Sequence, residues 1–378
     1  MSFTFYLPTQ LIFSDNAVDD LLAALNKPAE PVLFITDGGL VKAGVVEPFM
    51  TRMKEAGIQT VLYDAVPGNP NLEDVLPAVE AGQKAGCRWV VGLGGGSVLD
   101  TAKAAGVMLS HPGVDYEDLQ WGRVPLSNPP FPVVCIPTTA GTGSEVTKVT
   151  VIGDRKGFKK GLLHPFVFAK VAIVDGSLML ALPPNLTAAT GMDVLVHSME
   201  AYLGKRANPL TDLYALEAIR LVRTWLPEAT ANGGDLQARQ QMAKAATLAG
   251  IAFDQSGLGL VHALCGPLAG AYHLHHGLGV AVLLPYTLDF DAPAITTERW
   301  RPLAQALDLP ESAHPGDLKN LVIMFLQTLG LPTRLGELGL KREDIPAIAE
   351  GATRMAMIGN NVRAASAQDC MAILEAGL

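Results

Sequence analysis

The sequence lacks the features of a secreted or membrane-inserted protein. Its four cysteines, Cys87, Cys135, Cys265 and Cys370, form no C-x-x-C pair and no disulfide framework, which favours free thiols in a reducing compartment. No run of 18 apolar residues occurs, so we expect no membrane-spanning helix. The opening residues, MSFTFYLPTQLIFSD, carry neither a basic region nor a continuous apolar run. We therefore expect no signal peptide and a cytoplasmic location.

Clusters of one charge are also missing. Lysine and arginine are scattered along a chain whose net charge is −9, so a nucleic-acid-binding surface is not expected. Asp and Glu form no acidic tail. Charged residues make up 17% and hydrophobic residues 49% of the 378 residues. That balance predicts a globular enzyme with enough apolar residues for two domains.

The first half of the sequence alternates short apolar runs with amphipathic stretches. Strands are predicted at 31–36, 59–64, 88–94 and 131–138, separated by helical stretches that include 72–85 and 98–109. A further helical stretch is expected to run to about Ala56. This order predicts a parallel sheet with helices on both faces.

The pattern changes in the second half. Two more strands, VTKVTVIGD and VAIVDG, flank the basic loop DRKGFKKG, and after Leu180 strand signals nearly vanish. Helical patterns follow at 182–204, 208–226, 235–254, 258–270 and 276–291. We therefore predict an α/β Rossmann-like nucleotide-binding domain over 1–180 and an all-helical domain over 181–378.

A glycine-rich loop joins a predicted strand to a predicted helix. Gly92-x-Gly94-x-x-Ser97 nearly matches the dinucleotide-binding fingerprint, with Ser97 in place of the third glycine. Glycines let the backbone approach a phosphate, and the helix N-terminus offers free N–H groups. A tight strand-to-helix turn without a ligand is the alternative interpretation of this loop.

Two further features strengthen the nucleotide hypothesis. The segment Pro137–Ser144 follows another strand, and two such loops at the carboxyl ends of parallel strands would line one crevice. Asp37 ends the strand at 31–36, where a carboxylate would accept hydrogen bonds from a ribose 2′-hydroxyl and repel a 2′-phosphate. That position favours NAD over NADP, and an ordinary helix N-cap is the alternative interpretation of Asp37.

Acidic and imidazole side chains suggest a metal site in the second half. Asp193 and His197 are four residues apart in a helical pattern, which places them on one face. Four of the eight histidines fall within 262–276. Three imidazoles with one carboxylate suit Zn²⁺ or Fe²⁺. Spacing alone does not select among these histidines, and a histidine on an apolar helix is often a core residue.

These motifs together resemble the iron-containing (group III) alcohol dehydrogenase family over nearly the whole chain. The resemblance rests on GGGSVLDTAK at 94–103, PTTAGTGSE at 137–145, VDGSLMLALPP at 174–184 and the D-x-x-x-H of 193–197. His262 and His276, fourteen residues apart and followed by Gly277, complete the pattern. The resemblance implies an active site in the cleft between an N-terminal nucleotide-binding domain and a C-terminal helical domain.

The resemblance also implies roles for particular residues. The metal ligands would be Asp193, His197, His262 and His276. Phe253 would border the substrate channel. The cofactor would be held by Asp37, Asn69, Gly95, Gly96, Ser97, Asp100, Thr138, Thr139, Thr142, Ser144, Val146 and Lys160. Family members often dimerise through an N-terminal strand, so a homo-oligomer, a dimer or larger, is expected.

One position departs from the family pattern H-x-x-x-H-P. Gly266 replaces the second histidine of that motif, in His262-Ala-Leu-Cys-Gly266-Pro267. We therefore expect a wider substrate site whose proton route differs from that of relatives. His273 or His275 would be the substitute proton relay under this hypothesis, with His273 the first choice.

The function expected from the residues and the resemblance is NAD-linked alcohol dehydrogenation or aldehyde reduction. A divalent ion would polarise the alcohol or carbonyl oxygen while hydride moves to or from C4 of the nicotinamide. Within the same family, maleylacetate reductase or hydroxy-acid dehydrogenase are alternatives. A dehydroquinate-synthase-like lyase or a non-catalytic nucleotide- or metal-binding protein are more distant ones.

Overall fold

The computed structural model describes residues 2–156 and 158–378. Contacts between residues divide the chain into two compact units. We call Tyr6–Thr139 with Gly143–Ala181 the α/β unit, and residues 2–5, Ala140–Thr142 and Leu182–Leu378 the helical unit. The division therefore differs from a single boundary near residue 180, because two short N-terminal-half segments cluster with the helices.

The α/β unit is built on a parallel sheet of six strands in its described part. The order across the sheet is β1-β8-β5-β4-β2-β3. The strands are β1 (Gln10–Phe13), β2 (Val32–Ile35), β3 (Thr60–Tyr63), β4 (Trp89–Gly94), β5 (Val133–Pro137) and β8 (Val171–Val174). The central strands are buried on both faces, as continuous apolar runs in a parallel sheet predict.

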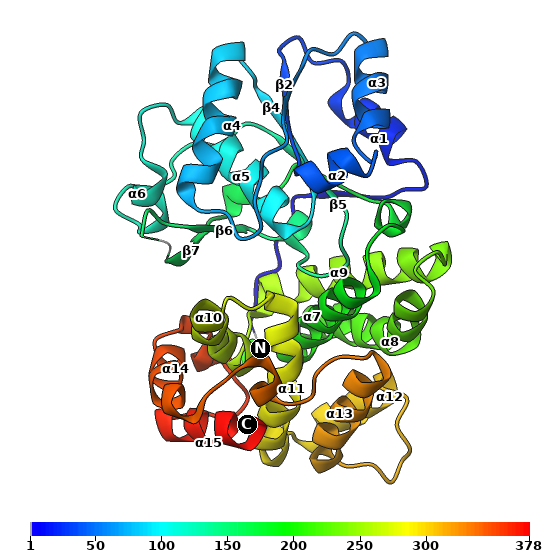
Figure 1. The fold of residues 1–378 in the computed structure, drawn as a ribbon, viewed down its shortest axis with the longest axis vertical. Coiled ribbons are helices and arrows are strands. Elements are labelled where there is room, and N and C mark those ends of the chain that lie inside the picture. The colour runs from blue at the N-terminus through cyan, green and yellow to red at the C-terminus, as the bar shows by residue number, and fades with distance from the viewer. Residues whose placement is uncertain (1, 157) are drawn as a thin grey trace. The chain divides into compact units, whose positions relative to one another are not determined.

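Helices cover both faces of this sheet and create two separate cores. Alternate residues of one strand point to opposite faces, so Leu33 and Ile35 join one cluster while Val32 and Phe34 join the other. Figure 1 shows α4 and α5 on one side of the sheet, and α1 and α3 on the other. The helices are α1 (Ala17–Leu25), α2 (Gly38–Lys42), α3 (Glu47–Glu55), α4 (Leu72–Ala85), α5 (Gly96–Ser110) and α6 (Tyr116–Gln120).

A small antiparallel hairpin completes the α/β unit. Strands β6 (Val149–Gly153) and β7 (Lys159–Leu163) pair with each other and not with the main sheet. The basic segment DRKGFKKG, expected as a loop leading to VAIVDG, is therefore partly strand, because its residues 159–161 begin β7. Residue 157, inside that loop, lies outside the described residues.

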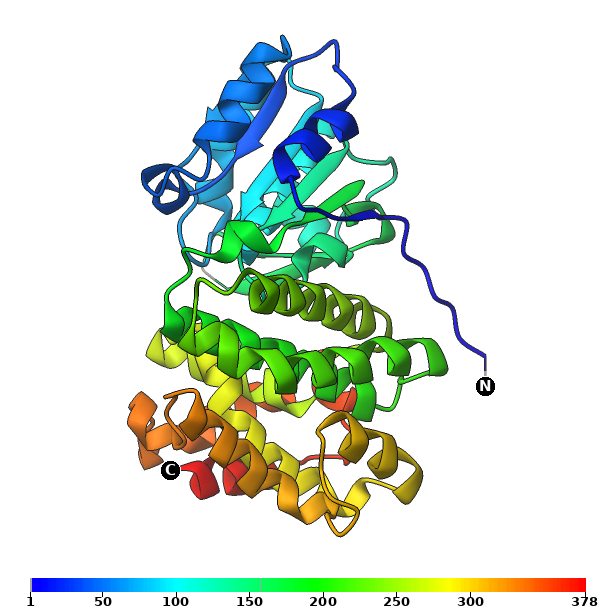
Figure 2. The same ribbon diagram turned by 90° about the vertical axis from the view of Figure 1, so that its right-hand side faces the viewer.

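The helical unit contains no strand among its described residues. Its long helices α7, α8 and α9 pack on one another (Figure 2), and α11 packs against α7, α10, α13 and α15. The helices are α7 (Pro184–Leu203), α8 (Pro209–Ala231), α9 (Leu236–Ser256), α10 (Leu260–Tyr272), α11 (His276–Asp291), α12 (Thr297–Ala306), α13 (Leu318–Thr328), α14 (Ile345–Thr353) and α15 (Ala367–Gly377).

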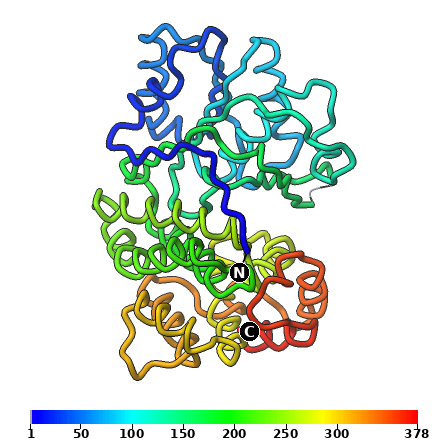
Figure 3. Tube along the Cα trace, turned by 180° about the vertical axis from the view of Figure 1, so that it is seen from behind, coloured from blue at the N-terminus to red at the C-terminus, as the bar shows by residue number. Residues whose placement is uncertain are grey.

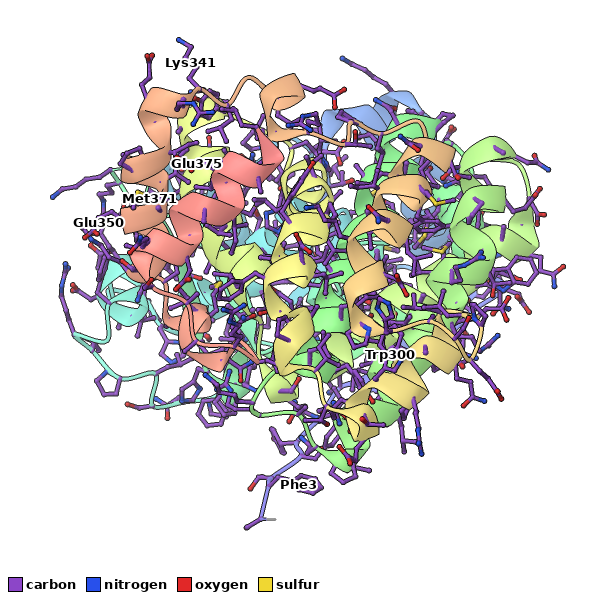
Figure 4. All side chains as sticks on the ribbon, turned by 90° about the horizontal axis from the view of Figure 1, so that it is seen from below. Phe3, Trp300, Lys341, Glu350, Met371 and Glu375 are labelled. Carbon is purple, nitrogen blue, oxygen red and sulfur yellow. The ribbon has the colours of Figure 1, made fainter. Side chains whose placement is uncertain are left out.

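Side chains of several elements mark the surface and edges of the helical unit. Figure 4 labels Lys341, Glu350 and Glu375, which are exposed, and Trp300 of α12, whose indole Nε1 donates to the carbonyl of Ala313. Near the N-terminus, the ring of Phe5 stacks on Tyr214 of α8 with centroids 5.9 Å apart. Figure 3 shows this N-terminal stretch from behind.

The predicted fold class is confirmed, with two local differences. The helical stretch expected to reach Ala56 is two helices, α2 and α3, because Gly44 adopts a left-handed φ of 74° between them. Of the N-terminal segment FTFYLPTQLIF, residues 3–13, expected to be the dimerising strand, only the last four residues are a strand, β1, which begins at Gln10. Among the described residues no single helix is long and apolar enough to cross a membrane, while α9 and α10, bent by 104°, meet that test only as a pair.

Candidate metal centre and nucleotide-binding loops

Helix α7 carries the first two predicted ligands on its buried face. Asp193 and His197 lie one turn apart, and each is at most 5% exposed. His197 Nε2 is 3.5 Å from Asp193 Oδ1. Charged and imidazole groups are costly to bury unless they are paired or bind a ligand, so their presence in a helix core needs a partner.

Helices α10 and α11 bring two more imidazoles to the same carboxylate. His262 Nε2 lies 3.7 Å and His276 Nε2 lies 3.8 Å from Asp193 Oδ1. His276 is the first residue of α11. A Cβ added at Gly277 would lie 2.5 Å from the backbone oxygen of Ala189 in α7, so only glycine lets the start of α11 approach α7 this closely.

The spacing of these atoms fits a shared divalent ion better than hydrogen bonds. All three nitrogens are beyond hydrogen-bond distance from Asp193 Oδ1. Ligands about 2.1 Å from one tetrahedral ion lie about 3.4 Å from each other. Asp193 Oδ1 and His262 Nε2 are buried and have no hydrogen-bond partner among the described residues. These orphaned atoms face one another, which is the arrangement that a bound cation would satisfy.

The four predicted ligands are not equally close. Ligand atoms of Asp193, His262 and His276 all lie within 4.8 Å of one another, whereas that compact group does not include His197. The His197 ring stacks on His262, with centroids 4.8 Å apart, and on Phe253, with centroids 4.4 Å apart. Phe253, predicted to border a substrate channel, therefore contacts a predicted ligand.

Electrostatics favour an ionised Asp193, and they shift the pKa values of His197 and His262 in opposite directions. Burial opposes ionisation of Asp193, but the surrounding histidines outweigh it and hold the pKa of Asp193 below its usual range. Burial lowers the pKa of His197 to about 4. Burial also disfavours the charged form of His262, yet Glu200 and Asp193 outweigh it and raise the pKa of that imidazole. A metal ion would replace the proton on His262, so binding is expected to release protons.

Glu200 is a residue of this centre that the sequence interpretation missed. It lies three residues after His197 on α7 and is 7% exposed. Its Oε2 is 2.6 Å from His262 Nδ1. The spacing D-x-x-x-H-x-x-E puts three side chains on one helix face. That spacing, together with a buried helix, was the available signal.

The predicted proton relay and the glycine substitution lie at the edge of this centre. His273 and His275 are exposed, and His273 ends α10 with a left-handed φ of 53°. Among the described residues no hydrogen bond, ion pair or ring contact joins His273 to the predicted ligands, so the relay stays a prediction. At Gly266 an added Cβ would meet the methyl of Met355 at 3.2 Å. The space expected to be open is therefore bordered by a thioether.

In the α/β unit, the glycine loop and Asp37 lie at a topological switch point. Strand β2 leads through helices to β3 on one side, whereas β4 leads to β5 on the other, and β2 and β4 are neighbours. Ligands of open α/β sheets bind beyond the carboxyl ends of strands at such a point. Asp37 follows β2, and its Oδ1 accepts N–H bonds from Gly39 and Leu40. Asp37 is therefore a helix N-cap.

The glycine loop is shaped by close packing of strand against helix. Cβ atoms added at Gly92 and Gly94 would lie 2.7 Å from Ala102 and 2.6 Å from Val98 of α5. Gly95 is the N-cap of α5, and Gly96 begins the helix. The loop therefore presents backbone N–H groups at the start of a 15-residue helix, as a phosphate-binding loop requires.

Asn69 and a lysine of the hairpin lie beside this loop. Asn69 adopts a left-handed φ of 57° and donates its backbone N–H to Ser97 Oγ at 3.2 Å. Lys159 Nζ donates to Asn69 Oδ1 at 2.5 Å. Lys160, the lysine predicted here, instead places its amine 5.1 Å from the Trp121 ring. Neighbouring residues of a strand face opposite sides. Lys159 and Lys160 of β7 therefore point in different directions, and Lys159 is the one that reaches Asn69.

The second loop is held mostly by internal hydrogen bonds. Asp100 accepts from Ser144 Oγ, and its other oxygen accepts the N–H of Val151. The buried Lys103 amine donates to the carbonyls of Ser144 and Val149. Two predicted cofactor residues, Asp100 and Ser144, thus contact each other.

The other predicted residues of this loop lie in different surroundings. Thr138 is 4% exposed and donates its N–H to the carbonyl of Gly94 at 3.0 Å. Thr139 lies beside Gly95, which joins the two loops. Val146 is fully buried, and Thr142 belongs to the helical unit.

Comparison with known proteins gives consistent matches over both units. A family described as iron-containing alcohol dehydrogenase matches residues 8–176, and the C-terminal part of the Fe-containing alcohol dehydrogenase family matches 187–378. An NAD-dependent methanol dehydrogenase of Bacillus methanolicus is 35% identical, with 99% of each chain covered. A sulfoacetaldehyde reductase of Bilophila wadsworthia is 34% identical, covering 100% of this chain and 99% of the relative. The solved structure of a 1,3-propanediol oxidoreductase is 34% identical, covers 100% of both chains and has a TM-score of 0.93.

Proposed function

The chain belongs to the iron-containing alcohol dehydrogenase family, and from that premise we propose that its helical unit holds one catalytic divalent ion through Asp193, His197, His262 and His276. The enzyme is an oxidoreductase acting on CH–OH groups, linked to NAD and to a metal. The proposal concerns which residues of this chain perform that chemistry.

The convergence of three imidazole nitrogens on Asp193 Oδ1 carries the proposal. The three distances lie between 3.5 and 3.8 Å, and two of the facing atoms are buried without a partner. A divalent ion bound there would polarise the oxygen of an alcohol or aldehyde. The protein residues hold the ion in place, and Phe253, stacked on His197, would exclude water from one side of the substrate.

The α/β unit would bind the nicotinamide cofactor at its switch point. We propose that the N–H groups at Gly95, Gly96 and Ser97 hold the pyrophosphate, with Lys159 rather than Lys160 supplying the nearby positive charge. Asp37 would accept hydrogen bonds from the adenosine ribose and so favour NAD over NADP. Its role as an N-cap is compatible with this, because the cap uses Oδ1 alone in the observed bonds.

The proposal extends to the kind of metal ion, the substrate class and the oligomeric state. Iron and zinc both suit the donor set. A small alcohol or aldehyde is the proposed substrate class, because 1,3-propanediol dehydrogenase of Citrobacter freundii and lactaldehyde reductase of Escherichia coli are 37% and 35% identical to this chain. We further propose a cytoplasmic protein, because none of its four cysteines, all of them described, forms a disulfide, and a homo-oligomer, because family members often dimerise.

The proposed function is tested by steady-state assays on purified protein. We expect NADH formation with a panel of short alcohols and diols, weaker use of NADP, loss of activity after chelation, and recovery on adding Fe²⁺ or Zn²⁺. Maleylacetate and hydroxy acids are included in the same panel, because they are the substrates of the two alternative activities. Turnover that persists at its full rate after complete metal removal would contradict the proposal.

A further inference from the structure

We propose that Glu200 is a positioning residue of the metal centre, fixing His262 so that its Nε2 is free for the ion. The inference rests on the proposed function, because it concerns the same centre. Glu200 extends from α7, the helix that carries Asp193 and His197, and reaches the far side of the His262 ring.

The hydrogen bonds of Glu200 determine which nitrogen of His262 carries a proton. Oε2 lies 2.6 Å from Nδ1. The same carboxylate accepts two backbone N–H groups at the start of α10 through Oε1, and a carboxylate that accepts at both oxygens leaves the donor role to its partners. Nδ1 must therefore be the donor, which leaves Nε2 as the nitrogen that faces Asp193 at 3.7 Å. A histidine that binds metal through one nitrogen usually donates the other to such a group.

The second oxygen of Glu200 holds the start of the helix on which His262 lies. Oε1 accepts the backbone N–H of Val261 at 2.7 Å and that of His262 at 3.3 Å. The N-cap of α10 is Gly259, which has no side chain to make these bonds. A Cβ at Gly259 would lie 3.2 Å from Oε1. Glycine therefore makes room for a cap supplied from α7.

Both oxygens of Glu200 thus face N–H donors, and glutamine cannot replace them. In Glu200→Gln the amide NH₂ must face either His262 Nδ1–H or the backbone donors of α10, whichever way the side chain turns. Ionised Glu200 and Asp193 also balance the two positive charges of a divalent ion, and the substitution removes one of the negative charges. Of the ligand histidines, His276 has a different neighbour at Nδ1, the sulfur of Cys265 at 3.7 Å.

Metal affinity of the full-length chain tests the inference. We expect Glu200→Gln to weaken Zn²⁺ binding about 10- to 100-fold in chelator competition. Affinity should be unchanged in Glu217→Gln, a partly exposed glutamate of α8 that pairs with Arg220. Asn361→Ala is the control for a lost cap on α10, since Asn361 Oδ1 accepts the Leu260 N–H, while its Nδ2 donates to Asp291 Oδ1 and to the carbonyl of Arg363. It should lower thermal stability while changing affinity less than Glu200→Gln.

Three outcomes separate the claims. Equal affinity losses in Glu200→Gln and Asn361→Ala, or an unchanged affinity in Glu200→Gln, would overturn the positioning role while leaving the metal centre intact. Unchanged binding in Asp193→Ala would instead overturn the proposed function and this inference with it. If Glu200→Gln does not fold, ¹⁵N-histidine NMR of the zinc-loaded wild type decides. A hydrogen-bonded Nδ1–H on His262 supports the role, and an unprotonated Nδ1 contradicts it.

Discussion

The two candidate sites of this chain are built in opposite ways. The metal centre of the helical unit consists of side chains, and two of its buried atoms, Asp193 Oδ1 and His262 Nε2, have no hydrogen-bond partner among the described residues. The candidate nucleotide site of the α/β unit consists of backbone groups at glycine residues. The polar side chains around it already form hydrogen bonds with one another and with the backbone. Removing a ligand side chain should therefore abolish metal binding selectively. Nucleotide binding should instead be weakened by adding a side chain to a glycine of the loop.

The largest expected effect comes from removing the central carboxylate. Asp193→Ala leaves three imidazoles without their shared partner, and we expect loss of bound metal and a fall in kcat/KM of about 10³-fold or more, since a metal Lewis acid contributes several kcal/mol. NADH affinity should change little. Asp289→Ala, an exposed carboxylate on α11 paired with Lys319, is the control. Metal content and turnover equal to wild type would refute the assignment.

The reciprocal change should break the nucleotide site and spare the metal. In Gly94→Ala the new Cβ would lie 2.6 Å from Val98, a β-branched residue in the first turn of α5, so strand and helix must separate. Overpacking of this kind costs about 1–3 kcal/mol, and we expect at least a tenfold weaker NADH affinity by fluorescence titration. Gly359→Ala, which meets nothing within 4 Å, should behave as wild type. Equal NADH affinity in Gly94→Ala and Gly359→Ala would contradict the assignment of the glycine loop to cofactor binding.

Adjacent lysines sharpen the position of the cofactor. Lys159→Met removes an amine beside Asn69, and Lys160→Met removes one over Trp121. We expect the first to raise the dissociation constant of NADH roughly fivefold or more, as for loss of a hydrogen bond to a charged group, and the second to have a smaller effect. The reverse order would restore Lys160 as the cofactor lysine.

A buried carboxylate behind the metal centre predicts a pH effect on stability. Burial raises the pKa of Asp291 to about 7 from 3.8, and Asn361 and Glu200 modify it less. Because the folded-state pKa is raised, its stabilising contribution is complete below pH 3.8 and is lost as pH rises through about 7.

Asp291→Asn should remove this dependence. The variant should gain stability relative to wild type by up to about 1.4 kcal/mol per pH unit between pH 4 and pH 7. Urea unfolding midpoints at pH 5 and pH 8 measure the difference. A constant difference between the two proteins across that range would show that Asp291 does not titrate.

The smallest expected effect concerns the glycine at the departure from the family pattern. Gly270→Ala on α10 meets open space and should stabilise by up to about 1 kcal/mol through helix propensity. Gly266→Ala should gain less, because its Cβ meets Met355 at 3.2 Å. Thermal melts of both variants test this. Equal gains would mean that Met355 moves freely and that the site is as wide as the sequence suggests.

The sequence predicted the sheet and the long helices because their apolar periodicity reflects burial directly. It missed the break at Gly44, where a left-handed residue interrupts a helical pattern. Asp193 and His197 could be paired by helix spacing, but the choice of His276 over His273 and His275 depended on resemblance. Which lysine lies near Asn69 depended on a one-residue strand register. Helix spacing places Glu200 on the face of Asp193 and His197, but its contact with His262 depends on the packing of α10 on α7, which periodicity does not encode.

The central claim is that one divalent ion binds between Asp193 and the histidines of α7, α10 and α11. Anomalous X-ray diffraction from crystals of the metal-loaded enzyme, measured on both sides of the iron and zinc absorption edges, tests it most directly. The account predicts a single anomalous peak per chain, within ligand distance of Asp193, His262 and His276. The absorption edge at which that peak appears identifies the metal. A full-occupancy peak elsewhere in the chain, with none at Asp193, would contradict it.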